Sequence, residues 1–450
     1  MADRVKNMTE GRPVSLMAAF AFPLILANLG QQLYMIADAI IVGKGVGVEA
    51  LAAVGATDWS YWLALWVILA LTQGFAIPIS HYFGQGNKKK IRQTVAMSVK
   101  LCAVSGVILT AVCLAAACPL LRLLKTPENI FGQASSYLLT MFAGIPVVMA
   151  YNMAAAILRA FGDGKTPLIA IAVAGVTNII LDLLFVLGFH WGVVGAAAAT
   201  VTAQFLAFLY CFVILKKMDL MALRKTDWAI RGYIIKSQCR LALPLALQQI
   251  LIAIGGMILQ SAINSQGFIF IAGFTATNKI YGLLESSAVS LGYAVTTYMA
   301  QNYGRGFYHR IREGLKGATL FAVALSVCIS AVMIAAGKPV LSLFIDQTSA
   351  DAPAVLDIAY HYLFIMSCLL FILYLLYVFR NTLQGLENPV GPLLSGIMEF
   401  AARVSVAWGF TRIWGDEVIF FAEPFAWVAA TAVLIVTCLQ TIRKLPDTLK

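Results

Sequence analysis

The chain has 450 residues, of which 61% are hydrophobic and only 12% carry a charge, against roughly 25% charged residues in an ordinary soluble domain. This composition excludes a soluble globular protein and indicates a protein that crosses the lipid bilayer several times. The formal net charge of +11 does not require a nucleic-acid partner, because Lys and Arg collect in the cytoplasmic loops of membrane proteins. We therefore expect no nucleic acid among its partners.

The apolar segments predict an all-α polytopic membrane protein with twelve transmembrane helices, since about 20 apolar residues span a bilayer. Most Lys and Arg residues, Arg380 among them, fall in connections on the side of the N-terminus. This distribution places both termini in the cytoplasm, and we expect a multi-pass monomer in the cytoplasmic (inner) membrane. The twelve segments are 14–43, 51–82, 90–118, 130–160, 166–188, 192–216, 234–264, 269–302, 309–337, 353–385, 390–412 and 418–441.

The first segment contains a lone acid, Asp38, within the apolar run from Pro23 to Gly43. An Asp near the middle of a transmembrane helix costs roughly 2.5 to 3.5 kcal/mol, so such residues usually face a cavity, a partner or an ion. Tyr34 lies one helical turn before Asp38 and shares its face, and Pro23 is expected to bend the helix. The simpler alternative is that the backbone or a nearby hydroxyl satisfies Asp38, which then has no wider role.

The fifth segment carries a second membrane acid, Asp182, with Asn178 one turn earlier on the same face. In the sixth segment Ala196 and Thr200 are also one turn apart and offer a backbone carbonyl and a hydroxyl. Asn152 interrupts the apolar fourth segment. Together with the acid and the phenol of the first segment, these groups predict a cation site built from oxygen atoms in the first half of the chain.

Oxygen ligands suit a proton or a small hard cation, whereas soft metals favour Cys and His. If Asp38 and Asp182 approach each other in a dehydrated pocket, one should take a proton, or a sodium ion should lie between them beside Asn178. The eight cysteines form no C-x-x-C pair and the four histidines no H-x-x-x-H pair. No cofactor is therefore expected beyond the coupling ion.

The least apolar connection, 216–236, divides the chain into two halves that repeat. A shift of 220 residues aligns the loop motif FGQG (83–86) with YGRG (303–306), and a shift of 225 aligns Pro167 with Pro392. Six crossings per half relate the halves by an axis along the membrane normal. We expect an N-lobe at 1–215, a cytoplasmic linker at 216–236 and a C-lobe at 237–450, as two pseudo-symmetric six-helix bundles around a central cleft.

Repeated bundles of this kind are typical of secondary transporters, in which one half rocks against the other. A duplicated channel or scaffold that does not rock is the alternative. The halves differ in their acids: the shift of 225 places Ala407 opposite Asp182, and aligning Pro23 with Pro244 places Leu259 opposite Asp38. Ion coupling is therefore expected in the first half.

The second half has other charges inside its apolar segments. Glu399 and Arg403 are one turn apart and most simply pair with each other, with a substrate role as the alternative. Glu285 either holds a cationic substrate or pairs with Lys279, and the sequence leaves both open. A substrate cavity could be lined by Gln31, Met35, Met149, Met153, Met257, Tyr281 and Glu285, although methionines at these spacings are more often ordinary core.

The order of these motifs resembles the MATE (multidrug and toxic compound extrusion) family over nearly the whole chain. The motifs are Tyr34 and Asp38, the FGQG loop, Asn152, RAFGDGKTPL (159–168), and Asn178 with Asp182. The resemblance implies a secondary antiporter, not an enzyme, that expels organic cations and other amphiphilic drugs in exchange for Na+ or H+. Its first-helix bending proline matches Pro23. The cation site of DinF-like members matches Tyr34, Asp38, Asn178, Asp182, Ala196 and Thr200, with Asn152 beside them.

Three other functions are alternatives for a chain of this composition. A lipid-linked precursor flippase of the same superfamily should line its cleft with basic residues that meet pyrophosphate, whereas the first half buries acids. A membrane-embedded enzyme would need a nucleophile, a metal cluster or paired His and acids at a defined spacing, and none is evident. A primary pump would need a G-x-x-x-x-G-K-[ST] loop, which the chain lacks.

Overall fold

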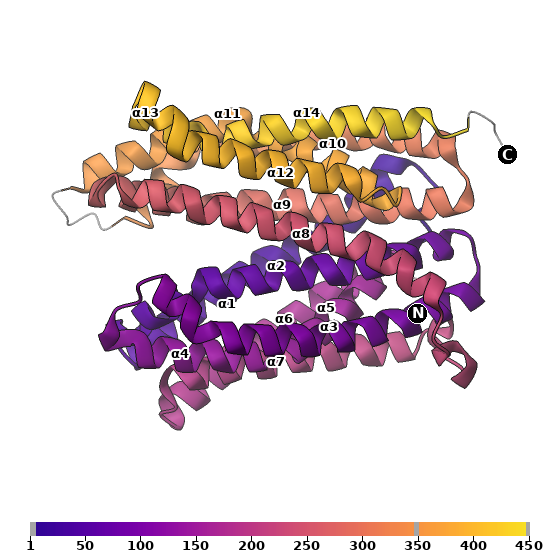
Figure 1. The fold of residues 1–450 in the computed structure, drawn as a ribbon, viewed down its shortest axis with the longest axis horizontal. Helices are drawn as coiled ribbons and strands as arrows, with labels where there is room; N and C mark the ends of the chain where they lie inside the picture. The colour runs from indigo at the N-terminus through magenta and orange to yellow at the C-terminus, as the bar shows by residue number, and fades with distance from the viewer. Residues whose placement is uncertain (1–5, 346–350, 447–450) are drawn as a thin grey trace. The chain divides into compact units, whose positions relative to one another are not determined.

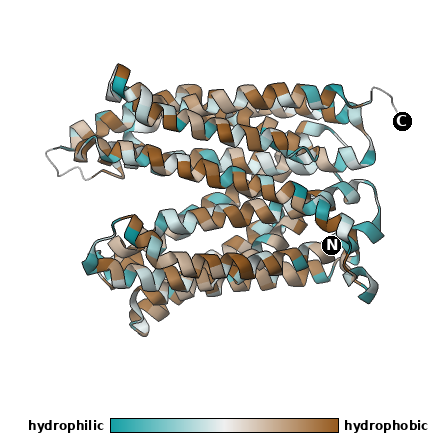
Figure 2. Ribbon diagram, in the orientation of Figure 1, coloured by the Kyte–Doolittle hydropathy of each residue, from teal (hydrophilic) through white to brown (hydrophobic). Residues whose placement is uncertain are grey.

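The computed structural model describes residues 6–345 and 351–446, and within these ranges the chain is helical and contains no strand. The prediction of an all-α fold is confirmed. Figure 1 shows that the chain is built mainly of long helices, and Figure 2 shows that they are hydrophobic along most of their length. The helices are α1 (Pro13–Gly45), α2 (Val48–Gly84), α3 (Lys88–Leu123), α4 (Glu128–Ala143), α5 (Ile145–Ala160), α6 (Lys165–Asp182), α7 (Gly192–Lys216), α8 (Gly232–Asn264), α9 (Phe268–Arg305), α10 (Tyr308–Ser342), α11 (Ala352–Gly385), α12 (Val390–Val404), α13 (Thr411–Trp414) and α14 (Ala422–Arg443).

Of the described helices, ten are long and apolar enough to span a membrane, or eleven if α4 and α5, which meet at 45°, form one bent span. The predicted fourth segment is thus broken at Gly144, between these two helices. The predicted eighth segment forms α9, which is long enough to span a membrane and carries Lys279 and Glu285, but is not among the helices apolar enough to be counted as a span.

The chain forms two compact units. Unit 1 holds Phe22–Ala246 with the described residues up to Met8, and unit 2 holds Thr9–Ala21 with the described residues from Leu247 onward. The division therefore passes through α1 and α8, close to the prolines inside them, Pro23 and Pro244. The connection 216–236 and the first turns of α8 belong to unit 1.

The repeat is visible in the backbone of both units. Gly86 and Gly306, the last residues of the FGQG and YGRG motifs, have positive φ angles of 69° and 79°, which glycine adopts without strain. One π-helical turn, η2 (Leu183–Gly188), follows α6, and another, η5 (Ser405–Phe410), follows α12. Asp182 and Val404 each directly precede one of these turns, so the structure aligns the two residues. The sequence shift of 225 aligns Asp182 with Ala407, three residues later.

In unit 1, the packing of α5 and the loop before α6 position the polar residues of the candidate cation site. Almost every residue of α5 is buried, and α5 packs against α2, α3 and α7. The loop before α6 is held by Asp163, whose Oδ1 accepts hydrogen bonds from the backbone N–H of Lys165 (3.0 Å) and Thr166 (2.9 Å). This N-terminal cap fixes the start of the helix that ends in Asp182.

Candidate functional site

Two carboxyl groups from different helices of unit 1 meet. Asp38 lies on α1, and Asp182 is the last residue of α6, directly before the π-helical turn η2. The carboxyl groups are close enough to share a hydrogen bond, and Asp182 has no exposed surface. Helices with π turns frequently carry functional residues, and here the turn begins at the residue after the second acid.

The oxygens of this pair lack donors. Among the described residues, nothing donates a hydrogen bond to Asp38 Oδ1, to either carboxylate oxygen of Asp182 or to Asn178 Oδ1, although all four atoms are buried. A buried acceptor without a donor costs about 1 to 3 kcal/mol, and more when it is charged. Two adjacent carboxylates cannot both remain ionised without compensation. The arrangement therefore suits a proton shared by the acids or a small cation bound between them.

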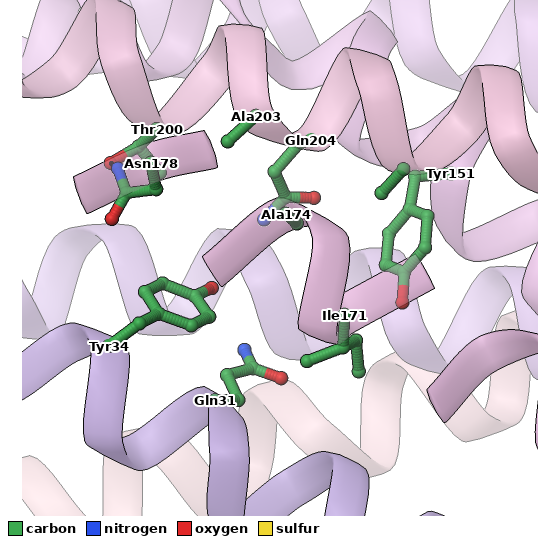
Figure 3. A pocket seen from close by; sticks show the side chains of 10 residues that line it. Gln31, Tyr34, Tyr151, Ile171, Ala174, Asn178, Thr200, Ala203 and Gln204 are labelled. Carbon is green, nitrogen blue, oxygen red and sulfur yellow. Dashed lines mark hydrogen bonds between the residues drawn. The ribbon is translucent and has the colours of Figure 1, made fainter. Parts of the chain in front are cut away.

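A small pocket lies beside the acids. Figure 3 shows Gln31 and Tyr34 of α1 on one side of the pocket, and Asn178 of α6 and Thr200 of α7 on another. Its free space is that of about one water molecule, so a single ion fits it and a drug molecule does not. The pocket is lined by Gln31, Tyr34, Tyr151, Ile171, Ala174, Asn178, Thr200, Ala203, Gln204 and Ala207.

A glycine lets α1 and α6 approach at this pocket. A Cβ atom added at Gly175 would lie 3.2 Å from Cδ1 of Tyr34, so the phenol ring packs directly on the α6 backbone. On the same helix, Asn178 Nδ2 donates to Thr200 Oγ1 of α7 over 3.3 Å. This bond leaves the Asn178 carbonyl oxygen free to accept from, or bind to, whatever occupies the acid pair.

The other predicted members of the cation site lie nearby in unit 1 but make different contacts. Asn152 is buried on α5, where its amide donates to the carbonyl of Val148 over 2.8 Å, and it does not line the pocket. Ala196 is fully buried in an apolar cluster that includes Val42 and Tyr137. The structure thus places Tyr34, Asn178 and Thr200 around one pocket, and it places Asp38 beside Asp182.

Three residues near the site were missed by sequence reasoning. Tyr151 and Gln204 line the pocket, and Gln204 Oε1 is another buried oxygen without a donor among the described residues. Asp58 lies on α2, close enough to act electrostatically on Tyr137, as do Asp38 and Asp182. Asp58 could have been predicted, because it is a charged residue inside the second apolar segment. No local sequence pattern marks Tyr151 or Gln204.

The substrate-cavity candidates are scattered over both units. Gln31 lines the pocket, and Met35, on the same helix, is half-buried. Met149 and Met153 are buried in the core of unit 1 and do not line the pocket, as ordinary core methionines would be. In unit 2, Met257 is half-buried, and the Tyr281 ring stacks on Trp427 with 5.9 Å between centroids.

The charges buried in unit 2 include the predicted Glu399–Arg403 ion pair, which is part of a larger network. Glu399 forms its short contact with Arg380 of α11 and lies 3.7 Å from Arg403. Arg403 is also bound at two points by Glu423 of α14, over 2.9 and 2.8 Å. The expectation that Arg380 lies in a cytoplasmic connection is wrong, because this residue is buried inside α11 and only 6% exposed. Two arginines and two glutamates thus form a neutral network that joins α11, α12 and α14.

Glu285 belongs to a separate contact. Its Oε1 accepts a hydrogen bond from the Tyr377 hydroxyl over 2.8 Å. Among the described residues, Glu285 and Lys279 form no ion pair with each other, and Lys279 is exposed. The predicted alternative of a Glu285–Lys279 pair is therefore wrong.

Known proteins share both the sequence and the fold of this chain. It is 30% identical to "Probable multidrug resistance protein YpnP" of Bacillus subtilis, over 77% of this chain and 78% of the relative. It is 25% identical to "Probable multidrug resistance protein NorM" of Thermotoga maritima, over 86% of this chain and 83% of the relative. The solved structure of a MOP superfamily transporter from Pyrococcus furiosus covers 98% of both chains, with a TM-score of 0.91 and 23% identity, and has the same fold.

The family model of MatE matches residues 23–184 and 244–408. The first match contains both acids, Asn178 and Pro23, and the second begins at Pro244, so the two matches follow the repeat. Together they cover well over half of the chain. The protein is therefore a member of the MatE family of membrane-embedded transporters.

Proposed function

We propose that this protein is a secondary active antiporter that exports cationic and amphiphilic drugs in exchange for Na+ or H+. Membership of the MatE family and the names of the relatives, multidrug resistance proteins and not enzymes, support export of small molecules. The proposed setting is the cytoplasmic membrane, and the basic residues of the connections support an orientation with both termini in the cytoplasm. The chain is proposed to act as a monomer.

One observation carries the proposed coupling site: Asp38 and Asp182 interact, and four buried oxygens of Asp38, Asp182 and Asn178 have no hydrogen-bond donor among the described residues. A proton on one acid would supply the missing donor. A sodium ion would instead bind the carboxylates, the Asn178 carbonyl and the Thr200 hydroxyl, all hard oxygen ligands. Either species is the transported ion and leaves again in each cycle.

The exchange of drug for ion is explained by the charge of the Asp38–Asp182 pair, which differs when the ion is bound and when it is absent. When the ion leaves, the two carboxylates repel each other and α1 is free to move away from α6. Pro23 removes one backbone hydrogen bond from α1, which lowers the cost of bending the helix at that point. Drug and ion then compete, either for unit 1 directly or for the conformation in which each binds.

The first test is ion-driven efflux from proteoliposomes, with a sodium gradient and a pH gradient imposed separately. Wild-type protein should respond to one gradient, which identifies the ion. Asp38→Asn and Asp182→Asn should respond to neither, whereas the matched variant Asp357→Asn, at an exposed position on α11, should behave as wild type. Unimpaired gradient-driven efflux in both acid variants would refute the coupling site.

A second measurement tests ion binding without transport. If Na+ is the ion, it stabilises the folded wild-type protein by about 2.7 kcal/mol at 100 times its Kd. The melting temperature in detergent should then rise with NaCl but not with KCl, and it should not rise in Asp182→Asn. A proton-coupled protein would show no sodium-specific rise.

The flippase alternative is not favoured. The buried site of unit 1 carries two acids and no basic residue among its pocket-lining side chains, which is the wrong charge for a pyrophosphate group. In unit 2 the buried arginines Arg380 and Arg403 are already bound by glutamates, so they offer no uncompensated positive charge.

A further inference from the structure

The connection between α7 and α8, with the first turns of α8, forms a basic surface on unit 1. We define it as the linker segment, residues 216–240. Two acids oppose its basic residues, and one of them, Asp227, is already paired with Arg92 of α3 over 3.2 Å. The basic residues, all exposed except the half-buried Arg231, are Lys216, Lys217, Arg224, Lys225, Arg231, Lys236 and Arg240.

Large apolar side chains lie exposed among these charges. Trp228 is 38% exposed, Ile230 76% and Tyr233 56%. The three positions lie within six residues, where α8 is about to begin. A soluble surface would seldom combine such side chains with so many basic residues, whereas Trp and Tyr are enriched where a membrane meets water.

The linker segment is held firmly against α3. Asp227 Oδ2 accepts from the backbone N–H of Arg224 over 2.9 Å, and Lys100 Nζ donates to the carbonyl of Trp228 over 2.5 Å. Lys100 lies inside the third apolar segment of the sequence, and this hydrogen bond gives its ammonium group a partner there. Ile234 packs on Ala96 and Met97 of α3. The backbone that presents the exposed residues is therefore fixed on unit 1.

Further along, α8 is fixed to unit 1 by a buried amide. Gln238 Nε2 donates to the carbonyl of Phe75 (3.0 Å) and to the hydroxyl of Ser98 (2.6 Å). A Cβ atom at Gly74 would lie 2.4 Å from Cα of Ala242, so α2 and α8 touch backbone to backbone. Whatever the linker segment binds is thereby connected rigidly to unit 1.

We propose that the linker segment is a binding surface for anionic phospholipids of the bilayer. The segment joins two candidate membrane spans, α7 and α8, so its ends lie where lipid headgroups begin. Trp228, Ile230 and Tyr233 enter the interface between headgroups and acyl chains. Arg224, Lys225, Arg231 and Lys236 meet the lipid phosphates, to which Arg and Lys donate strong charge-assisted hydrogen bonds.

Lipid binding by native mass spectrometry tests this proposal without any transport measurement. The full chain in detergent is titrated with dioleoylphosphatidylglycerol and, separately, with dioleoylphosphatidylcholine. The anionic lipid should bind at least about tenfold more tightly, since each basic residue near such a lipid contributes about fivefold. The preference should fall as the salt concentration rises, and excess inorganic phosphate should not displace the lipid.

Two quadruple variants distinguish the effect of the linker segment from that of the total positive charge of the protein. Arg224→Gln/Lys225→Gln/Arg231→Gln/Lys236→Gln should lose the preference for the anionic lipid. The control Lys88→Gln/Lys89→Gln/Arg305→Gln/Lys316→Gln removes the same charge from exposed positions elsewhere and should keep it. An equal loss in both variants, or no preference in the wild-type protein, would overturn the proposal.

A third variant tests the apolar part of the surface. Trp228→Ser/Ile230→Ser/Tyr233→Ser should weaken the binding of both lipids and leave their ratio unchanged. Unchanged lipid affinity in this variant would overturn the insertion of these side chains. Retention of an acidic protein on immobilised wild-type chain, with no lipid preference, would identify a protein partner instead and also overturn the proposal.

Discussion

The two units of this protein bury acidic residues in opposite ways. In unit 1, Asp38 and Asp182 lie against each other with oxygens that no described residue satisfies. In unit 2, Glu399 and Glu423 are bound by Arg380 and Arg403. Both arrangements lie within helices long enough to cross a membrane, yet only the second is electrically complete.

The difference separates an exchangeable charge from a structural one. A carboxylate held by a guanidinium at hydrogen-bond distance cannot release its partner without exposing two buried charges, which is costly. A pair of acids without a fixed partner binds whatever mobile cation reaches it. The duplicated halves thus differ in their buried charges: the second forms a complete ionic network, while the first holds the acids that we propose bind the ion.

Asp182→Asn is expected to have the largest effect, complete loss of ion-driven drug efflux from proteoliposomes. The amide cannot carry the charge that binds an ion. The fold should remain at least as stable as wild type, because a buried carboxylate without a donor is removed. Efflux and melting temperature are measured on the same preparation. A variant that unfolds instead would show that Asp182 is structural, like the acids of unit 2.

Arg380→Met should lower the free energy of unfolding by about 3 to 5 kcal/mol, because it leaves Glu399 buried without its main partner. The double variant Arg380→Met/Glu399→Met should recover most of this loss, since no isolated charge remains. Denaturant unfolding in detergent measures both variants. If the single variant is as stable as wild type, the network of unit 2 is not the structural counterpart proposed here.

Tyr377→Phe should cost about 1.5 to 3 kcal/mol of stability, the range for a hydrogen bond to a charged group. The substitution removes the hydroxyl that donates to Glu285 and keeps the ring. Glu285→Gln in the same background should restore part of the loss, because a neutral amide needs less compensation. An unchanged unfolding midpoint in Tyr377→Phe would show that Glu285 is stabilised by other groups.

Gly175→Ala should have the smallest effect, an increase of about threefold in the ion concentration that gives half-maximal efflux. The added methyl would lie 3.2 Å from the Tyr34 ring and displace it by a few tenths of an ångström. Gly132→Ala is the control, since nothing lies within 4 Å of its Cβ position. Equal behaviour of the two variants would show that the position of Tyr34 does not affect ion binding.

The sequence by itself determined the fold class, the duplication and the identity of the two acids in unit 1. Apolar length predicts membrane helices, and a charge inside such a length is costly enough to mark a special residue. The one-turn spacing of Tyr34 with Asp38, and of Asn178 with Asp182, follows from helical geometry alone. These inferences need only local information along the chain.

Contacts between helices decided the rest. The local spacing predicts that Glu399 pairs with Arg403, but its second partner, Arg380, depends on how α11 and α12 are rotated about their axes, which a segment's own composition does not specify. The same reason explains why Gln204 and Tyr151 of the pocket were missed. The assignment of Thr9–Ala21 to unit 2 also required the tertiary structure, because a continuous helix in the sequence carries no mark of where its packing partners change.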